Sequence, residues 1–250
     1  MNEEKNVLII PDVHGRSFWK EAVEQYWEKC SKIVFLGDYT DPYPSEDITR
    51  RSALEQLLQI IDLKQSDPQR VVLLLGNHDL HYMYREFVRG SRYSASHAHR
   101  LKEVFLSHSS LFQLAHEEEL YGTRFLFTHA GVLPLWYQAH REDIESLCAE
   151  SLNRLNTPYH RQHMLSEVSY LRGGMENYGS FLWGDMCEWD DDSCIDGIYQ
   201  VFGHTQLEEP KITVHWACLD CRQAILLHYD QSNCNDRACS HFFIPINSSI

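Results

Sequence analysis

The chain has 250 residues, with 22 Lys and Arg against 36 Asp and Glu, which gives a net charge of −14 at neutral pH. Hydrophobic residues make up 43% of it and charged residues 23%, the balance of an ordinary folded protein, and this excludes global disorder. The acid excess argues against a protein that coats nucleic acid or lies on an anionic membrane, because both need a basic surface. It does not exclude a phosphorylated substrate, since a bound metal can reverse the charge locally.

The amino-terminal residues do not have the pattern of an export signal. Several are acidic, and the apolar run at 7–10 is much shorter than the hydrophobic region of a signal peptide. No stretch approaches the roughly 18–20 apolar residues of a membrane-spanning helix. We therefore expect a cytoplasmic protein with no membrane or nucleic-acid partner, whose eight cysteines are mostly reduced. The sequence does not indicate an oligomeric state.

Short apolar runs alternate with amphipathic stretches in the first third of the chain. Strands are predicted at 7–10, 32–36 and 71–75, with helices at 18–29 and 48–63 between them. This alternation is typical of α/β proteins with a parallel sheet.

The rest of the chain is more mixed. Residues 80–120 and 135–171 have mainly helical patterns, and a turn at 121–123 leads into a strand at 124–128. Strand-like runs return at 198–202, 211–219 and 224–229, and a final strand is expected within 233–250. No repeat or Pro/Ser-rich linker marks a boundary. We expect a single domain over 1–250 with helical insertions at about 82–118 and 135–178.

Five predicted strands end in side chains that can bind a metal. In chain order these are Asp12 and His14, Asp38 and Asp41, Asn77 and His78, His129, and His204. Because ligands collect outside the carboxyl ends of strands in open α/β sheets, the five clusters are expected to converge. Any one cluster alone could be a buried, hydrogen-bonded polar group. All five in this order predict a metal or phosphate site.

With these motifs the sequence resembles the calcineurin-like metallophosphoesterases, and most closely the PPP-type serine/threonine phosphoprotein phosphatases and their bacterial relatives. The matching blocks are Asp-Val-His-Gly at 12–15, Gly-Asp-Tyr-Thr-Asp at 37–41, Gly-Asn-His-Asp at 76–79, Leu-Trp-Gly-Asp at 182–185, His-Ala-Gly at 129–131 and Gly-His-Thr at 203–205. The resemblance implies a four-layer α/β/β/α sandwich in which the helical insertions cap the site.

The resemblance also implies two divalent metal ions. Asp12 and His14 would hold one ion, Asn77, His129 and His204 the other, and Asp38 would bridge both. Mixed oxygen and imidazole ligands suit Mn, Fe, Zn or Co, and we expect Mn to be the most effective in vitro. Two such ions activate a hydroxide for attack on phosphorus. In the family pattern His78 is the general acid that protonates the leaving oxygen, and Asp41 orients His78.

The sequence departs from the family at the arginines that clamp phosphate. Pro42-Tyr43 stands where the family has Arg-Gly, and no arginine lies between Asp185 and Phe202. A replacement could come from the inserted region, where Arg92 is the preferred substrate-binding candidate. The other arginines of that cluster are Arg85, Arg89 and Arg100. An exposed, solvated charge is the alternative interpretation for each of them.

Two further patterns invite a metal interpretation. Cys218, Cys221, Cys234 and Cys239 have spacings loosely compatible with a structural zinc site, although cysteines on strands are commonly small buried apolar residues. The pairs His97/His99 and His160/His163 could also be ligands. They lack the strand ends of the main clusters, and a surface position is the simpler interpretation.

Together these observations predict a metal-dependent hydrolase of phosphomonoesters, similar to serine/threonine protein phosphatases. The substrate would be a phosphoprotein or a phosphorylated small molecule. One alternative is a nucleotide or dinucleotide polyphosphate hydrolase similar to the diadenosine tetraphosphatases. Another is a non-catalytic, metal-stabilised module that binds phosphorylated partners.

Overall fold

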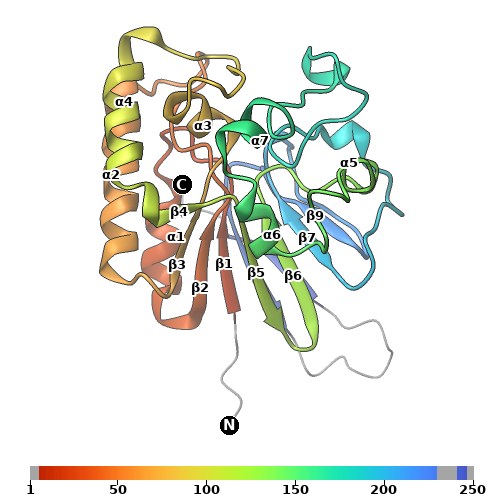
Figure 1. Ribbon diagram of the computed structural model, residues 1–250. Helices are drawn as coiled ribbons and strands as arrows, with labels where there is room; N and C mark the ends of the chain where they lie inside the picture. Colours follow the sequence, from red (N-terminus) through yellow and green to blue (C-terminus); the bar gives the residue numbers. More distant parts are fainter. Residues whose placement is uncertain (1–5, 230–240, 247–250) are drawn as a thin grey trace.

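Two β-sheets pack face to face at the centre of the molecule (Figure 1). The computed structural model describes residues 6–229 and 241–246. Within these ranges the first sheet has six strands, in the order β11 (His241–Ile246), β10 (Ala224–Tyr229), β1 (Asn6–Ile10), β2 (Cys30–Phe35), β3 (Val71–Leu74) and β4 (Phe112–Gln113). The second sheet, over the same ranges, has five strands, in the order β5 (Ala115–Leu120), β6 (Thr123–Thr128), β7 (Tyr199–Phe202), β9 (Trp216–Cys218) and β8 (Lys211–Ile212).

Helices flank the pair of sheets. Helices α1 (Phe18–Tyr26), α2 (Arg50–Ser66) and α4 (Ala95–Ser107) lie on the outer side of the first sheet, and α5 (Pro134–Ala139) and α6 (Ala149–Arg154) lie on the side of the second (Figure 1). Helices α3 (Asn77–Met83) and α7 (Pro158–Gln162) lie at the upper end. The 3₁₀ turns are Trp27–Lys29, Ser109–Leu111, Tyr170–Arg172 and Met186–Glu188. The α/β/β/α order of layers expected from the sequence is confirmed.

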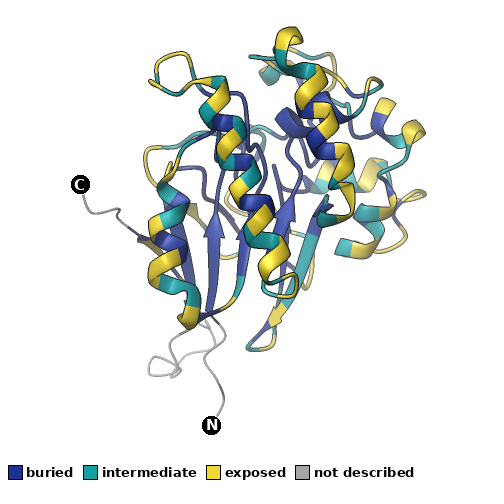
Figure 2. Cartoon of the chain, turned by 90° about the vertical axis from the view of Figure 1, so that its left-hand side faces the viewer, coloured by how far each residue is buried: buried dark blue, intermediate teal, exposed yellow. Residues whose placement is uncertain are grey.

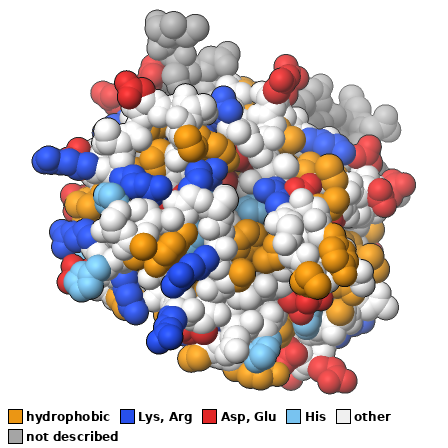
Figure 3. Space-filling model, turned by 90° about the horizontal axis from the view of Figure 1, so that it is seen from above, with side chains coloured by type: hydrophobic (Ala, Val, Ile, Leu, Met, Phe, Trp, Pro, Cys, Tyr) orange, Lys and Arg blue, Asp and Glu red, His pale blue; other side chains and the backbone are white. Residues whose placement is uncertain are grey.

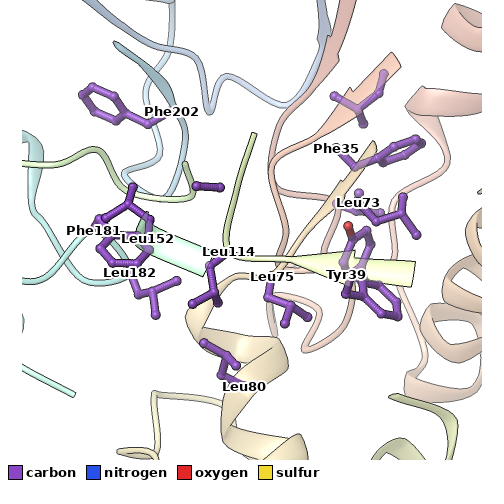
Figure 4. Close-up of a cluster of buried hydrophobic side chains, with 14 of the residues drawn as sticks. Phe35, Tyr39, Leu73, Leu75, Leu80, Leu114, Leu152, Phe181, Leu182 and Phe202 are labelled. Carbon is purple, nitrogen blue, oxygen red and sulfur yellow. The ribbon is translucent and has the colours of Figure 1, made fainter. Parts of the chain in front are cut away.

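Strands β1 and β3 of the first sheet are buried on both faces, which explains their continuous apolar runs. Val7 and Ile9 of β1 belong to a hydrophobic cluster shared with Phe125 of β6, so they lie between the two sheets. The alternate residues of β1, such as Leu8, join a second cluster together with residues of the helices. Part of that second cluster, around Phe35, Leu73 and Tyr39, is shown in Figure 4. Figure 2 shows the matching helices, each with a buried inner stripe and an exposed outer one.

The parallel arrangement predicted for the first third is confirmed. Strand β1 pairs in parallel with β2, with Ile9 opposite Val34, and β2 pairs in parallel with β3, with Val34 opposite Val72. Strands β6, β7 and β9 of the second sheet are also mutually parallel. The carboxyl ends of β1, β2, β3, β6 and β7 therefore point to the same end of the molecule, which is the upper end in Figure 1.

The prediction that 80–120 is mainly helical is wrong at its end. Residues 115–120 form β5, which pairs antiparallel with β6 along its whole length. The turn between them has Tyr121 at φ 51° and Gly122 at φ 81°, the left-handed pair typical of a tight hairpin. The run of glutamates at 117–119 has low strand propensity, and the pairing partner overrides it. The inserted region therefore contains strands as well as helices.

Two other segments are less regular than expected. Residues 135–171 contain only short helices, because Pro134 and Pro158 each begin a new one and no long apolar period follows. Residues 211–219 form not one strand but the hairpin β8–β9, closed by Thr213, whose N–H donates to the Trp216 carbonyl. The predicted final strand includes β11, and 233–240 and 247–250 lie outside the described residues. None of the helices in the described ranges is both long and apolar enough to cross a membrane.

A substitution tests whether the packing around Gly131, the glycine of the His-Ala-Gly block, leaves room for a side chain. Gly131 has φ +78°, and a Cβ there would lie 2.5 Å from the Trp189 ring and 2.8 Å from the Phe202 ring. Gly131→Ala should therefore lower the free energy of unfolding by about 2–4 kcal/mol, from backbone strain plus overpacking. Gly122→Ala is the matched control, because Gly122 has φ +81° and nothing within 4 Å. It should cost only about 1 kcal/mol. Urea unfolding measures both, and equal losses would contradict the packing argument.

Candidate metal centre

The loop after β1 carries Asp12 and His14 and is hydrogen-bonded to the loop after β2. The His14 N–H donates to the Asp38 carbonyl at 2.7 Å, and its ring Nδ1 donates to the Thr40 carbonyl at 2.8 Å. The lone pair of His14 is therefore on Nε2. This atom lies 3.5 Å from one carboxylate oxygen of Asp38 and 4.0 Å from Asp12.

Asp38 lies between this group and a second one. Its Oδ2 faces His14, while its Oδ1 accepts the His78 N–H at 2.9 Å and lies 3.6 Å from His129 Nε2. Asp38 is 2% exposed. The same carboxylate is thus shared by two sets of potential ligands, one on each side of it.

The second group joins the ends of three separate elements. His129 donates from Nδ1 to the Leu36 carbonyl at 2.8 Å, which leaves the lone pair on Nε2. This nitrogen lies 3.0 Å from Asn77 Oδ1 and 3.0 Å from His204 Nδ1. The His204 N–H donates to Asp12 Oδ1 at 2.9 Å and so ties the last loop to the first.

Several acceptor atoms of these six side chains face one another. The lone pair on His129 Nε2 faces the Asn77 oxygen, and Asp12 Oδ2 has no hydrogen-bond partner among the described residues. Burial, together with nearby Asp38, raises the pKa of Asp12 to about 8, and burial lowers the pKa of His14 to about 3. Neutral imidazoles and carboxylates arranged in this way fit divalent cations. Asp12 would release its proton when a cation binds.

A third cluster of side chains beside the metal centre surrounds the Asp41 carboxylate. His78 Nδ1 donates to Asp41 Oδ2 at 2.9 Å, and the Tyr82 hydroxyl donates to Asp41 Oδ1 at 2.6 Å. His81 Nε2 also lies 2.9 Å from Asp41 Oδ2. Burial alone would raise the pKa of Asp41, but the contacts from His78, His81 and Tyr82 outweigh it and lower that pKa. Asp41, His78 and His81 lie close enough together to hold a cation, but both oxygens of Asp41 already accept hydrogen bonds.

The comparisons agree with this geometry. The family model described as calcineurin-like phosphoesterase matches residues 5–209. The chain belongs to the calcineurin-like phosphoesterase family. The protein is thus a phosphoesterase, a hydrolase acting on phosphate esters, with buried Asp and His groups able to bind divalent metals.

A solved structure shows the same fold at low identity, and a second one is less similar. A protein serine/threonine phosphatase from Saccharomyces cerevisiae, with similarity to human phosphatase PP5, has a TM-score of 0.56 and 14% identity, over 98% of this chain and 80% of that one. YfcE, a phosphoesterase from E. coli, has a TM-score of 0.38 and 11% identity, over 90% of this chain and 88% of that one.

The phosphoesterase site also uses a carboxylate to which the sequence analysis gave no role. Asp79 is fully buried and accepts three backbone N–H groups, from Gly76 and Asp38 at 2.8 Å and from Tyr39 at 3.0 Å. It joins the loop after β2 to the loop after β3 and so holds Asp38 beside Asn77. The signal was its place at the third residue of a helix, where an acidic side chain bonds back to the residue before the helix.

A cavity of about 140 Å³ opens above the metal ligands, and two arginines line it. Its other lining residues include His14, Asp38, Asn77, His78, Trp183 and His204. Arg92 Nη2 lies 3.3 Å from His14 Nε2 and 3.3 Å from His78 Nε2, with its guanidinium 3.8 Å from the centre of the Tyr43 ring. The structure thus places the sequence-predicted candidate at the site, next to the tyrosine that stands at the family's Arg-Gly position.

The second arginine, Arg172, was missed. It lies 2.6 Å from Asp185 and donates to the Thr205 hydroxyl at 2.5 Å. The family pattern places an arginine after Asp185, whereas Arg172 precedes that residue. Asp185, the acid of the Leu-Trp-Gly-Asp block, could have indicated that a basic side chain lies nearby. Arg85, Arg89 and Arg100 are exposed and are not among the residues that line the cavity.

None of the other candidate ligands within the described residues belongs to the two groups of side chains that share Asp38. Cys218 and Cys221 are buried free thiols, while Cys234 and Cys239 lie outside the described residues, so the zinc hypothesis remains a prediction. His97 contacts Ser94 and Ser96, and exposed His99 lies near Glu103. His160 faces Asp143, and His163 packs on Tyr159.

The shared position of Asp38 predicts its effect on metal content. Asp38→Asn replaces a charged carboxylate that faces both ligand groups by a neutral amide, so the variant should retain fewer than two metal ions per chain after dialysis. Asp41→Asn, whose side chain faces His78 instead, should retain two. Plasma mass spectrometry on both proteins measures this, and two ions retained in Asp38→Asn would contradict the bridging role.

Proposed function

We propose that the protein hydrolyses phosphomonoesters, with His78 as the general acid and with Arg92 and Arg172 binding the phosphoryl oxygens. The observation that carries the proposal is the cavity, because its lining combines metal ligands, the His78 ring and two guanidinium groups. Each guanidinium presents several N–H donors to an oxyanion. We further propose that Mn²⁺ supports the activity and that the protein works in the cytoplasm.

The metals would be held by Asp12, His14, Asp38, Asn77, His129 and His204. When bound, such ions polarise phosphoryl oxygens and lower the pKa of water, so that hydroxide is available at neutral pH. The chain itself supplies the dry, rigid setting, since all six side chains are buried.

His78 is arranged to give a proton away. Its Nδ1 is committed to Asp41, which is kept ionised by its donors, so the exchangeable proton lies on Nε2. An ionised carboxylate behind the ring stabilises the protonated imidazole and fixes the tautomer. Nε2 faces the cavity beside Arg92, where a leaving oxygen would be protonated.

The size of the cavity favours a substrate whose phosphoryl group enters while the rest stays outside. About 140 Å³ accommodates a phosphoryl group and a few further atoms, far less than a typical small-molecule pocket of 300 Å³ or more. This fits a phosphorylated side chain of a protein or the end of a small phosphomonoester. The intact His78–Asp41 pair and the complete ligand set argue against a purely non-catalytic module. A dinucleotide polyphosphate would have to extend well beyond the cavity.

The direct test compares p-nitrophenyl phosphate with bis(p-nitrophenyl) phosphate, after the metal has been stripped and Mn²⁺ restored. The monoester should be hydrolysed faster, because its additional charged oxygen can be bound by both arginines. A preference for the diester would move the assignment to phosphodiester or nucleotide substrates. No turnover of either, with two metals bound, would support the binding module.

A matched pair of variants ties this preference to the cavity. Arg172→Ala should reduce the preference for the monoester. Arg85→Ala, which removes an exposed arginine outside the cavity, should leave the preference unchanged.

The role of His78 is tested by its dependence on the leaving group. His78→Asn should lower kcat for phenyl phosphate by about 10²–10⁴, because its leaving oxygen needs a proton. The loss should be much smaller for p-nitrophenyl phosphate, whose leaving group departs as a stable anion. Metal content should stay at two ions, since His78 is not a ligand. Equal losses on both substrates would argue that His78 acts otherwise.

A further inference from the structure

The segment at 90–94, called here the Arg92 loop, brings Arg92 over the metal centre without an acidic partner for its side chain. In the described ranges the Arg92 side chain contacts His14 and His78 and no carboxylate, and the residue has a left-handed backbone with φ 61°. The loop runs close to the ligands, since a Cβ on Gly90 would lie 3.3 Å from the Asn77 amide and 3.1 Å from the Trp183 ring. Something other than its own charge pairing must therefore hold this loop in place.

Three side chains contact the Asp41 carboxylate at one end and the backbone of the Arg92 loop at the other. The Tyr82 hydroxyl donates to Asp41 Oδ1 at 2.6 Å and accepts the Ser94 N–H at 2.9 Å. Arg50 donates from Nη1 to Asp41 Oδ1 at 3.0 Å and from Nη2 to the Arg92 carbonyl at 3.1 Å.

The third bridge is His81. Its Nδ1 accepts the Gly90 N–H at 3.2 Å, so its proton is on Nε2, the atom that lies 2.9 Å from Asp41 Oδ2. Together the three bridges reach the beginning, the middle and the end of the Arg92 loop. Tyr93 stacks on Tyr82, with ring centres 5.0 Å apart. This packs the loop against α3, the helix that carries His81 and Tyr82.

The protonation states of all three bridges are compatible with one another and with catalysis. Tyr82 and Arg50 each donate a hydrogen bond to Asp41, His78 donates a third, and His81 Nε2 lies 2.9 Å from Asp41 Oδ2, so an ionised Asp41 suits all four side chains. The carboxylate is completely buried, with no exposed side-chain area. A buried anion with three hydrogen bonds is strongly stabilised and rigid, which makes it a fixed reference point.

We propose that His81, Tyr82 and Arg50 are positioning residues that set Arg92 over the metal centre by tying its loop to Asp41. Since Asp41 also orients His78, one carboxylate then fixes both the general acid and a phosphate-binding arginine. The inference rests on the proposed function for the role of Arg92, but the bridges themselves can be tested without turnover.

The first experiment uses two single-residue variants, each with a neighbouring control, in Mn²⁺-loaded protein. Tyr82→Phe removes one bridge and Arg50→Ala another. Tyr93→Phe is the control for the first, because its hydroxyl makes no hydrogen bond within the described residues. Arg51→Ala is the control for the second, since this neighbour is 90% exposed and pairs only with Glu55.

Three readouts decide the outcome. Binding of inorganic phosphate, measured by calorimetry, should weaken roughly tenfold in both test variants and less than about twofold in the controls, the size of one lost charge-assisted hydrogen bond. KM for p-nitrophenyl phosphate should rise by a similar factor, with a smaller change in kcat. Hydrogen exchange of the peptide spanning 90–94 should be about five- to tenfold faster in Tyr82→Phe than in Tyr93→Phe.

A double-mutant cycle shows whether the bridge acts through Arg92. In an Arg92→Ala background, Arg50→Ala should cause almost no further loss of phosphate affinity, because both changes remove the same contact. Additive losses would mean that Arg50 acts independently and would overturn the inference.

Other results also overturn it. A fall in kcat alone, with phosphate affinity and hydrogen exchange unchanged, would show that Tyr82 and Arg50 act only on His78. Test variants that match their controls in all readouts would show that the bridges do not position the loop. If the wild type binds phosphate but hydrolyses no monoester, the proposed function fails, while phosphate affinity and exchange still decide the role of the bridges.

Discussion

The structure depends on one electrostatic constraint, the crowding of buried acceptor atoms at the shared end of two sheets. Two carboxylates, three imidazoles and an amide lie together, each almost without solvent exposure. Acceptors in such a place are costly unless cations lie among them. The surrounding elements must therefore hold these groups together against mutual repulsion whenever metal is absent. Buried hydrogen bonds hold them: three backbone N–H groups donate to the Asp79 carboxylate, and His14 and His129 donate to backbone carbonyls.

The backbone at the site is strained, and the strain is concentrated there. Of the non-glycine residues with positive φ in the described ranges, five lie in or beside the centre: His14, Asp38, Asp41, Arg92 and His204. Each such conformation costs about 1 kcal/mol or more for an ordinary residue, although Asp and His accept it better than most. A chain keeps such conformations only when packing and hydrogen bonds fix them on several sides. The buried strands β1, β2 and β7 lead into His14, Asp38 and His204 and supply that support. Hydrogen bonds to Arg50, Tyr82 and His81 hold the loop that carries Arg92.

The sequence allowed the strands and their terminal ligands to be predicted because both are local signals. An apolar run such as 7–10 followed by Asp12 and His14 is visible within ten residues, and the carboxyl-end rule then brings distant runs together. Features that depend on a contact with a residue elsewhere in the chain could not be predicted from the sequence. Residues 115–120 were predicted to be helical, although the turn and the strand after them were predicted, because the glutamates at 117–119 have low strand propensity and only pairing with β6 overrides it. Arg172 was missed for the same reason, since its role depends on a contact with Asp185 that sequence order does not reveal.

The two cavity arginines differ in what they contribute, and the difference explains the departure from the family pattern. Arg172 is paired with Asp185, so it offers fixed donors but little net charge. Arg92 has no acidic partner in the described ranges, and its guanidinium rests on the face of Tyr43, an aromatic surface that supports a cation without neutralising it. Tyr43 therefore supports an arginine that comes from the inserted region. Figure 3 shows the end of the molecule that carries the site, where Lys and Arg gather on one half while most Asp and Glu lie toward the edge. Charge screening over about 8 Å limits how strongly the distant acids oppose an anion that approaches Arg92, despite the net charge of −14.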